Sequence, residues 1–126
     1  MLFRSRYFTF HGFQPTDRLV DFYRRAYLLV QTSRHEACGI AVLEAASCGV
    51  PIVGTAVGHV ADWSPVRAVA VHERDPHRLA SEVARLLDDS ALRARLAAGA
   101  REWTVAHDAD WTAREFERVY HEITAS

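Results

Sequence analysis

The chain has 126 residues, of which 49% are hydrophobic, and its 15 basic and 16 acidic residues give a formal net charge of −1. The length fits one domain or part of one, and the composition excludes a disordered chain. The balanced charge does not suggest a protein that binds nucleic acid in general. Two cysteines are too few for a disulfide framework, so we expect a reducing, cytoplasmic environment. No apolar run is long enough to cross a bilayer.

The N-terminal part is predicted to contain one strand and one helix. Tyr7–Phe10 is β-branched and aromatic, which predicts a strand that ends at His11 and Gly12. Thr16 is expected to cap a helix over Asp17–Arg25, in which apolar residues recur at helical spacing. A simple turn after the strand explains Gly12.

The central part is predicted to form a strand, a loop, a short helix, a tight turn and a second strand. Tyr27–Val30 is apolar throughout, which is typical of a parallel strand covered on both faces. Val50–Gly54 predicts the next strand. Residues 36–51 lie between them and read EACGIAVLEAASCGVP. In this stretch Gly39 opens the helix and Gly49 closes it, because a left-handed residue at a helix end is most easily glycine.

The start of this short helix predicts a ligand site. Free backbone N–H groups together with the helix dipole suit a phosphate. Glu36 precedes the helix and Glu44 lies inside it, and a carboxylate accepts hydrogen bonds well from sugar hydroxyls. An ordinary helix with a solvated glutamate at each end also explains this spacing, and residue types alone favour that simpler interpretation. The N–H groups expected to lack acceptors belong to Cys38, Gly39, Ile40 and Ala41.

Taken together, the residues of this region resemble the S-x-x-E-x-x-G-x-x-x-x-E-A motif and the G-x-P tail of retaining group 1 glycosyltransferases. The resemblance covers nearly the whole chain but only the last part of that family's C-terminal domain. It implies an α/β fold with a Rossmann-like parallel sheet and flanking helices, an incomplete half of a GT-B fold. Residues 1–126 would form a partial C-terminal nucleotide-sugar-binding domain. The residues that carry the motif here are Ser33, Glu36, Gly39, Glu44, Ala45, Gly49, Pro51 and Gly58.

The resemblance also implies a reaction, in which a sugar passes from a nucleotide-diphospho-sugar to an acceptor hydroxyl with retained configuration. Glu36 would be the catalytic residue and hold hydroxyls of the donor sugar, while Glu44 would hold the ribose hydroxyls. The amides at the helix start would stabilise the leaving diphosphate. No cofactor is implied beyond the donor substrate, and no metal. At Gly12 the resemblance implies a ligand contact, which is as consistent with the sequence as a simple turn. The residues assigned to donor binding are Gly12, Ser33, Cys38, Gly39, Ile40, Ala41 and Glu44.

Residues 54–59, which follow the second central strand, are expected to form a loop. The family usually has two glycines here and then an acidic residue. In this chain His59 stands at the second glycine position, and Asp62 is the acidic candidate. His59 is interpreted either as a donor contact or as a solvent-facing loop histidine, with the second favoured. The spacing of the candidate metal ligands does not match a strong zinc-binding pattern. These candidates are His35, Cys38, Cys48 and His59.

The C-terminal part is predicted to begin with a short strand at Val69–His72 and a helix that starts at Asp75 and Pro76. Ser90–Ala100 predicts another helix, followed by a terminal helical region. The tryptophans are interpreted as packing anchors rather than as sugar-stacking residues. The large apolar residues assigned to the terminal region are Trp103, Trp111, Phe116, Val119 and Tyr120.

Partners are inferred from what the family has and this sequence lacks. The family's C-terminal domain normally begins with two further strand–helix units, whose arginine and lysine face the donor diphosphate. We therefore expect the chain alone not to transfer sugar and to need an N-terminal domain or a partner chain. Because unpaired strand edges are costly, Tyr7–Phe10 is expected to pair beside Tyr27–Val30 or with a second copy, giving a homodimer. An acceptor at a membrane surface also fits the family.

Two other functions remain open at this point. The chain could be a non-catalytic nucleotide-sugar-binding module, or a subunit that completes its site with a separate protein. It could also keep the fold with an empty cleft. A sugar-phosphate epimerase is disfavoured, because the E-x7-E pattern is absent from the usual signature of such enzymes.

Overall fold

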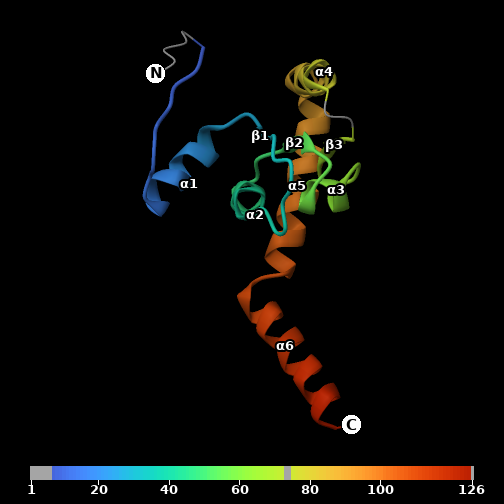
Figure 1. The fold of residues 1–126 in the computed structure, drawn as a ribbon. Coiled ribbons are helices and arrows are strands. Elements are labelled where there is room, and N and C mark those ends of the chain that lie inside the picture. Colours follow the sequence, from blue (N-terminus) through green and yellow to red (C-terminus); the bar gives the residue numbers. More distant parts are fainter. Residues whose placement is uncertain (1–6, 73–74, 126) are drawn as a thin grey trace.

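The computed structural model describes residues 7–72 and 75–125 and shows an α/β fold, in which helices flank a small parallel sheet (Figure 1). The predicted fold class is confirmed. In chain order the elements are α1 (Thr16–Arg25), β1 (Leu29–Gln31), α2 (Ile40–Ser47), β2 (Ile52–Thr55), α3 (Gly58–Trp63), β3 (Val69–Val71), α4 (Pro76–Asp88), α5 (Ser90–Ala106) and α6 (Ala109–Thr124).

The sheet has the order β1-β2-β3, and both strand pairs are parallel. Leu29 pairs with Ile52, and Val53 pairs with Val69. Ile52 and Val53 are both fully buried, because β2 is the central strand and helices cover both of its faces. An apolar strand of this kind is typical of a parallel sheet.

The core consists of two clusters, one on each face of the sheet. Successive side chains of a strand point to opposite faces, so Ile52 belongs to one cluster and Val53 to the other. Each fully buried aliphatic side chain stabilises the fold by roughly 1.5–3 kcal/mol. The first cluster contains Val42, Ala46, Ile52, Val60, Trp63, Ala68 and Ala100. The second contains Val53, Leu86, Leu92 and Leu96.

The N-terminal segment differs from its prediction. Tyr7–Phe10 is not a strand of the sheet, and β1 pairs with β2 alone among the described strands. The expected pairing of Tyr7–Phe10 beside β1 is therefore wrong. Figure 1 shows this segment and α1 to one side of the sheet. Aromatic residues of this kind form a strand only where a neighbouring strand and a buried face accept them. Within the described part of the chain neither is present here, and Phe8 and Phe10 are each 71% exposed.

Helix boundaries show further differences. Thr16 does not cap α1 but is its first residue, and the cap position is Pro15, which makes no side-chain hydrogen bond. The fixed φ of proline fits the extended cap position. Gly58 and His59, expected as the end of a loop, instead begin α3, which is too short to show a helical period in the sequence. Trp103 belongs to α5, which continues to Ala106.

The predicted start of α4 is confirmed, and the Asp75 carboxylate caps this helix by accepting a hydrogen bond from the His77 N–H at 2.8 Å. Asp89 and Asp108 cap α5 and α6 in the same way, through the N–H groups of Leu92 and Trp111. Figure 1 shows α6 extending away from the sheet. Within the described residues, none of the helices has the length and apolar character needed to cross a membrane.

Candidate functional site

Glu36 lies at the carboxyl end of β1, where neighbouring polar side chains hold one of its oxygens. The Gln31 Nε2 donates a hydrogen bond to Glu36 Oε2 at 3.0 Å, and the Ser33 Oγ donates to the same oxygen at 3.3 Å. Gln31 Nε2 also donates to Ser33 Oγ at 2.8 Å. The other carboxylate oxygen, Oε1, accepts no hydrogen bond from the described part of the chain. One oxygen is therefore fixed, and the other is available to a ligand.

Two glycines enclose the aliphatic part of Glu36. Gly39 and Gly58 have φ angles of 71° and 51°, a backbone conformation that only glycine adopts readily. A Cβ atom at Gly39 would lie 3.1 Å from Glu36 Cγ, and one at Gly58 would lie 3.3 Å from the same atom. A side chain at either position would therefore require the aliphatic part of Glu36 to shift by a few tenths of an ångström. The backbones that begin α2 and α3 thus shape the surroundings of this carboxylate.

The start of α2 is not capped by a side chain. Gly39 is its N-cap residue in the left-handed conformation, and the first turn contains no acidic residue. The N–H groups of Val42 and Leu43 donate to the Gly39 carbonyl. Cys38 and Ile40 are exposed and Ala41 is half-buried, whereas Gly39 itself is buried, so the helix start is only partly open to solvent. Such a terminus attracts an anion because its N–H groups and dipole point outward.

Glu44 lies elsewhere on α2, facing α1. The Tyr23 hydroxyl donates a hydrogen bond to Glu44 Oε2 at 3.0 Å. Burial, the hydrogen bond to Glu44 and the negative charge of that carboxylate raise the pKa of Tyr23 to about 12. Glu44 lines a cavity of about 190 Å³ between the two helices. The other lining residues are Thr16, Leu19, Val20, Tyr23, Ser47 and Cys48.

The structure brings some of the sequence-predicted residues together and separates others. Ser33 and Gly39 contact Glu36, whereas Glu44 lines a different cavity from Glu36. Gly12 lies in the N-terminal segment with a φ of 65°, and nothing approaches within 4 Å of a Cβ atom placed there. The open hollow at Glu36 has a volume of about 520 Å³ and is lined by His35, Glu36, Ala37, Val57 and Gly58.

A second cavity, of about 390 Å³, adjoins the Glu36 hollow at the carboxyl ends of all three strands. Ligands of open parallel sheets collect at this edge. The cavity shares Val57 with the Glu36 hollow and also contains Ser33. Its other lining residues are Thr32, Arg34, Thr55, Ala56, Val71, His72, Asp75, Pro76 and Leu79.

His59 is not the solvent-facing loop residue that was favoured from the sequence. It lies in α3 and is half-buried, because its ring stacks on Trp63 at a centroid distance of 5.0 Å. Its Nε2 lies 3.8 Å from Cys38 Sγ. The rings continue through Trp103, His107 and Trp111, with centroid distances of 5.2, 4.0 and 4.6 Å. We call these five residues the aromatic stack.

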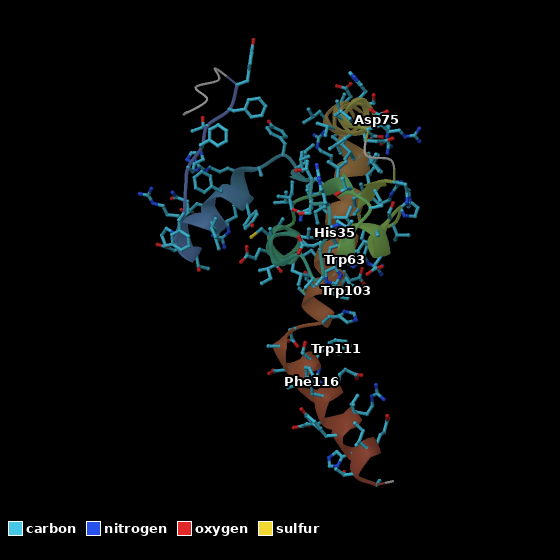
Figure 2. The ribbon with its side chains drawn as sticks, in the orientation of Figure 1. His35, Trp63, Asp75, Trp103, Trp111 and Phe116 are labelled. Atoms are coloured by element: carbon cyan, nitrogen blue, oxygen red, sulfur yellow. The ribbon has the colours of Figure 1, made fainter. Side chains whose placement is uncertain are left out.

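Figure 2 shows the tryptophans of the aromatic stack in succession from the body of the protein toward α6. Trp63 is buried, and its ring meets the Trp103 ring edge-on at 5.1 Å. This arrangement agrees with their interpretation as packing anchors. Among residues 7–72 and 75–125, no three histidine, cysteine or acidic side chains converge as a metal site would require.

Sequence reasoning missed two residues that touch the glutamates, Gln31 and Tyr23. Gln31 could have been noticed as a polar residue that ends the apolar run at residues 27–30. Tyr23 had no comparable signal, because the helical period assigned it only to the apolar face of α1. Its contact with Glu44 follows from how α1 packs on α2.

Comparison with known proteins identifies sequences related to this chain. The family model described as glycosyl transferases group 1 matches residues 5–103. The D-inositol 3-phosphate glycosyltransferase of Salinispora arenicola is 39% identical over 115 residues, which cover 90% of this chain and 26% of that protein. A protein of the same description from Catenulispora acidiphila is 42% identical over 88 residues, which cover 68% and 21% respectively.

A solved structure supports the same relationship. The sucrose-phosphate synthase of Thermosynechococcus elongatus superposes with a TM-score of 0.81 at 28% sequence identity. The match covers 93% of this chain and 30% of that chain. The chain thus spans about a quarter of the length of the curated relatives it matches.

Proposed function

This chain belongs to the group 1 glycosyl transferase family, and on that premise we propose that it is the donor-binding part of a retaining glycosyltransferase. Residues 1–126 would be a partial C-terminal domain that binds a nucleotide-diphospho-sugar. The observation that carries the proposal is the environment of Glu36. Its carboxylate has one fixed and one available oxygen, and it contacts the glycine that begins an uncapped helix.

The chemistry of a sugar diphosphate suits these two features. The hydroxyls of the sugar are hydrogen-bond donors, and an ionised carboxylate is their strongest acceptor. The diphosphate gains charge as the bond to the sugar breaks, and the free N–H groups at the start of α2 stabilise that charge. We therefore assign the sugar to Glu36 and the diphosphate to the backbone of Cys38, Gly39, Ile40 and Ala41.

Glu44 is assigned to the ribose of the donor. It lies five residues beyond Gly39, which corresponds to about 7.5 Å along the helix axis. A nucleotide-diphospho-sugar is long enough to extend from Glu36 past the helix start toward Glu44. Tyr23 occupies Glu44 Oε2, so a ribose hydroxyl would use Oε1. Gly12 belongs to the same proposal, as a backbone position open to close approach.

Sugar transfer is proposed only for a larger assembly. The chain spans about a quarter of its curated relatives, so the acceptor site would lie in an N-terminal domain or a partner chain. Two unpaired cysteines and a nucleotide-sugar substrate fit a cytoplasmic enzyme. The acceptor could be a small sugar phosphate or a molecule at a membrane surface.

Calorimetric titration of the purified chain tests the donor assignment. UDP, GDP and ADP, and the corresponding glucose or mannose conjugates, are titrated up to millimolar concentration. We expect one nucleotide series to bind, and Glu36→Ala to weaken binding of its sugar conjugate. Glu102→Ala is the control, because Glu102 is an exposed carboxylate on α5. No binding in any series would refute the proposal and favour a fold with an empty cleft.

A non-catalytic nucleotide-sugar-binding subunit is the second candidate, because the open hollow at Glu36 could hold a donor sugar without any acceptor site beside it. The two candidates differ in turnover. The chain is mixed with the complementary portion of a group 1 relative and assayed for transfer from the donor that it binds. Transfer supports the enzyme, whereas donor binding without transfer supports the subunit.

A further inference from the structure

We propose that Gln31 is a positioning residue for Glu36: its side-chain amide fixes Oε2 and so leaves Oε1 oriented toward the donor sugar. The inference deepens the proposed function and rests on it for the identity of the ligand. The contacts that carry it are those among Gln31, Ser33 and Glu36.

The direction of each hydrogen bond in this group follows from its chemistry. An ionised carboxylate only accepts, so the Gln31 group that meets Glu36 must be its NH2. The two N–H bonds of that NH2 have two acceptors, Ser33 Oγ at 2.8 Å and Glu36 Oε2 at 3.0 Å. Ser33 accepts from Gln31 and therefore uses its own proton to donate to Glu36 Oε2 at 3.3 Å. The three bonds form a closed ring in which Oε2 is the final acceptor.

The sheet fixes where Gln31 lies. In the parallel register Gln31 pairs with Gly54 of β2. A Cβ atom at Gly54 would lie 2.9 Å from Gln31 Cβ, so only glycine lets the end of β1 approach this closely. The Thr55 hydroxyl donates to the Ser33 carbonyl at 2.6 Å, which ties the loop after β1 to the end of β2. Two strands therefore set the geometry of the Gln31 amide.

The ring of bonds has a consequence for ligand selection. The terminal torsion of a glutamate is broad, so a carboxylate without partners samples many orientations. Holding Oε2 selects one orientation, in which Oε1 alone remains for a ligand hydroxyl. Loss of the Gln31 amide should therefore weaken recognition of the sugar and leave the nucleotide unaffected, since the nucleotide is assigned to α2.

The first test needs no ligand. The chain contains two glutamines, Gln14 and Gln31, and the Gln14 amide donates to the His11 carbonyl at 2.6 Å. Side-chain amide resonances of both are followed by NMR in the wild type and in Glu36→Ala. We expect the Gln31 amide protons to shift upfield and exchange faster in the variant, while those of Gln14 stay unchanged. Unchanged Gln31 resonances would overturn the proposal, whatever the protein binds.

The second test separates positioning from a structural role. Gln31→Met and its control Gln14→Met are titrated with UDP, GDP and ADP and with UDP-glucose, GDP-mannose and ADP-glucose. We expect Gln31→Met to weaken the sugar conjugate about tenfold, the size of a lost hydrogen bond to a charged group, without changing the affinity for the nucleotide. Equal loss for both ligands, or no loss, would overturn the positioning role. If the wild type binds none of the six, the proposed function fails, and the NMR result still decides whether Gln31 holds Glu36.

Discussion

The body around β2 and the two helices at its margins, α1 and α6, use similar apolar residues with opposite results. Ile52 and Leu86 are fully buried in the body, whereas Phe13 ahead of α1 is 97% exposed and Phe116 of α6 is 60% exposed. Within their described ranges, neither α1 nor α6 has a buried residue. The difference teaches that amphipathic or aromatic sequence forms local structure, while burial depends on whether a neighbouring element is present to accept it.

The largest effect on stability should come from creating a cavity in the core of the body. Leu86→Ala removes a fully buried side chain of α4 and should lower the free energy of unfolding by about 2–5 kcal/mol. Phe13→Ala is the matched change at the margin and should stay within about 0.5 kcal/mol of the wild type. Urea unfolding followed by circular dichroism measures both. Similar losses of unfolding free energy for the two variants would show that the margin contributes as much to stability as the body.

A smaller effect is expected at the glycine that begins α2. Gly39→Ala forces a left-handed backbone on alanine, which costs about 1–2 kcal/mol, and its Cβ would press on Glu36 Cγ at 3.1 Å. Gly49→Ala imposes the same strain, with a φ of 75°, but its nearest neighbour is Arg101 Cδ at 4.0 Å. Both variants should lose similar stability in urea unfolding. Titration with nucleotide-sugar should show loss of binding for Gly39→Ala alone.

The helix caps extend this comparison, because an aspartate N-cap occurs both in the body and at the margin. Asp89 caps α5 in the body and Asp108 caps α6 at the margin, each through a 2.8 Å bond from a backbone N–H. Asp89→Ala should lower global stability by about 1 kcal/mol. Asp108→Ala should leave the global transition nearly unchanged and increase hydrogen exchange within α6. A global loss from Asp108→Ala would show that α6 unfolds together with the body.

The smallest effect concerns the contact between α1 and α2. The pKa of Tyr23 rises from 10.0 to about 12 in the folded chain, mainly through burial and then through its bond to Glu44. A raised pKa means that the stabilisation is complete below pH 10 and is lost as the pH rises toward about 12. The stability difference between wild type and Tyr23→Phe should therefore shrink over that range. Absorbance at the phenolate band, compared between the two proteins, should show that the part missing from Tyr23→Phe appears near pH 12 in the wild type.

The parts of the fold that the sequence predicted are those set by local chemistry. Gly39 and Gly49 mark both ends of α2 because the backbone needs a left-handed residue there. Asp75 marks the start of α4 because its side chain serves as the cap. The strands β1 and β2 were each predicted to start two residues too early and to end one residue too early, since apolar character extends beyond the paired residues.

The parts that the sequence did not predict depend on tertiary contacts. Tyr7–Phe10 has strand-forming residues, but β1 does not pair with it. At the candidate site, Glu36, Ser33 and Gly39 were named from their motif and lie together. The local signal of Gln31 is only that it ends an apolar run, whereas its contact with Glu36 depends on the approach of β1 to Gly54, a relation between distant residues.

The aromatic stack determines what a spectroscopist would see in this protein. The chain has three tryptophans, and all of them belong to the stack. Intrinsic emission therefore reports on α3, α5 and α6 as one optical unit, and excitation can migrate between the indoles. Motion of α1 or of the N-terminal segment would leave the tryptophan fluorescence unchanged. Separation of α6 from α5 would shift its emission wavelength, so no attached dye is needed.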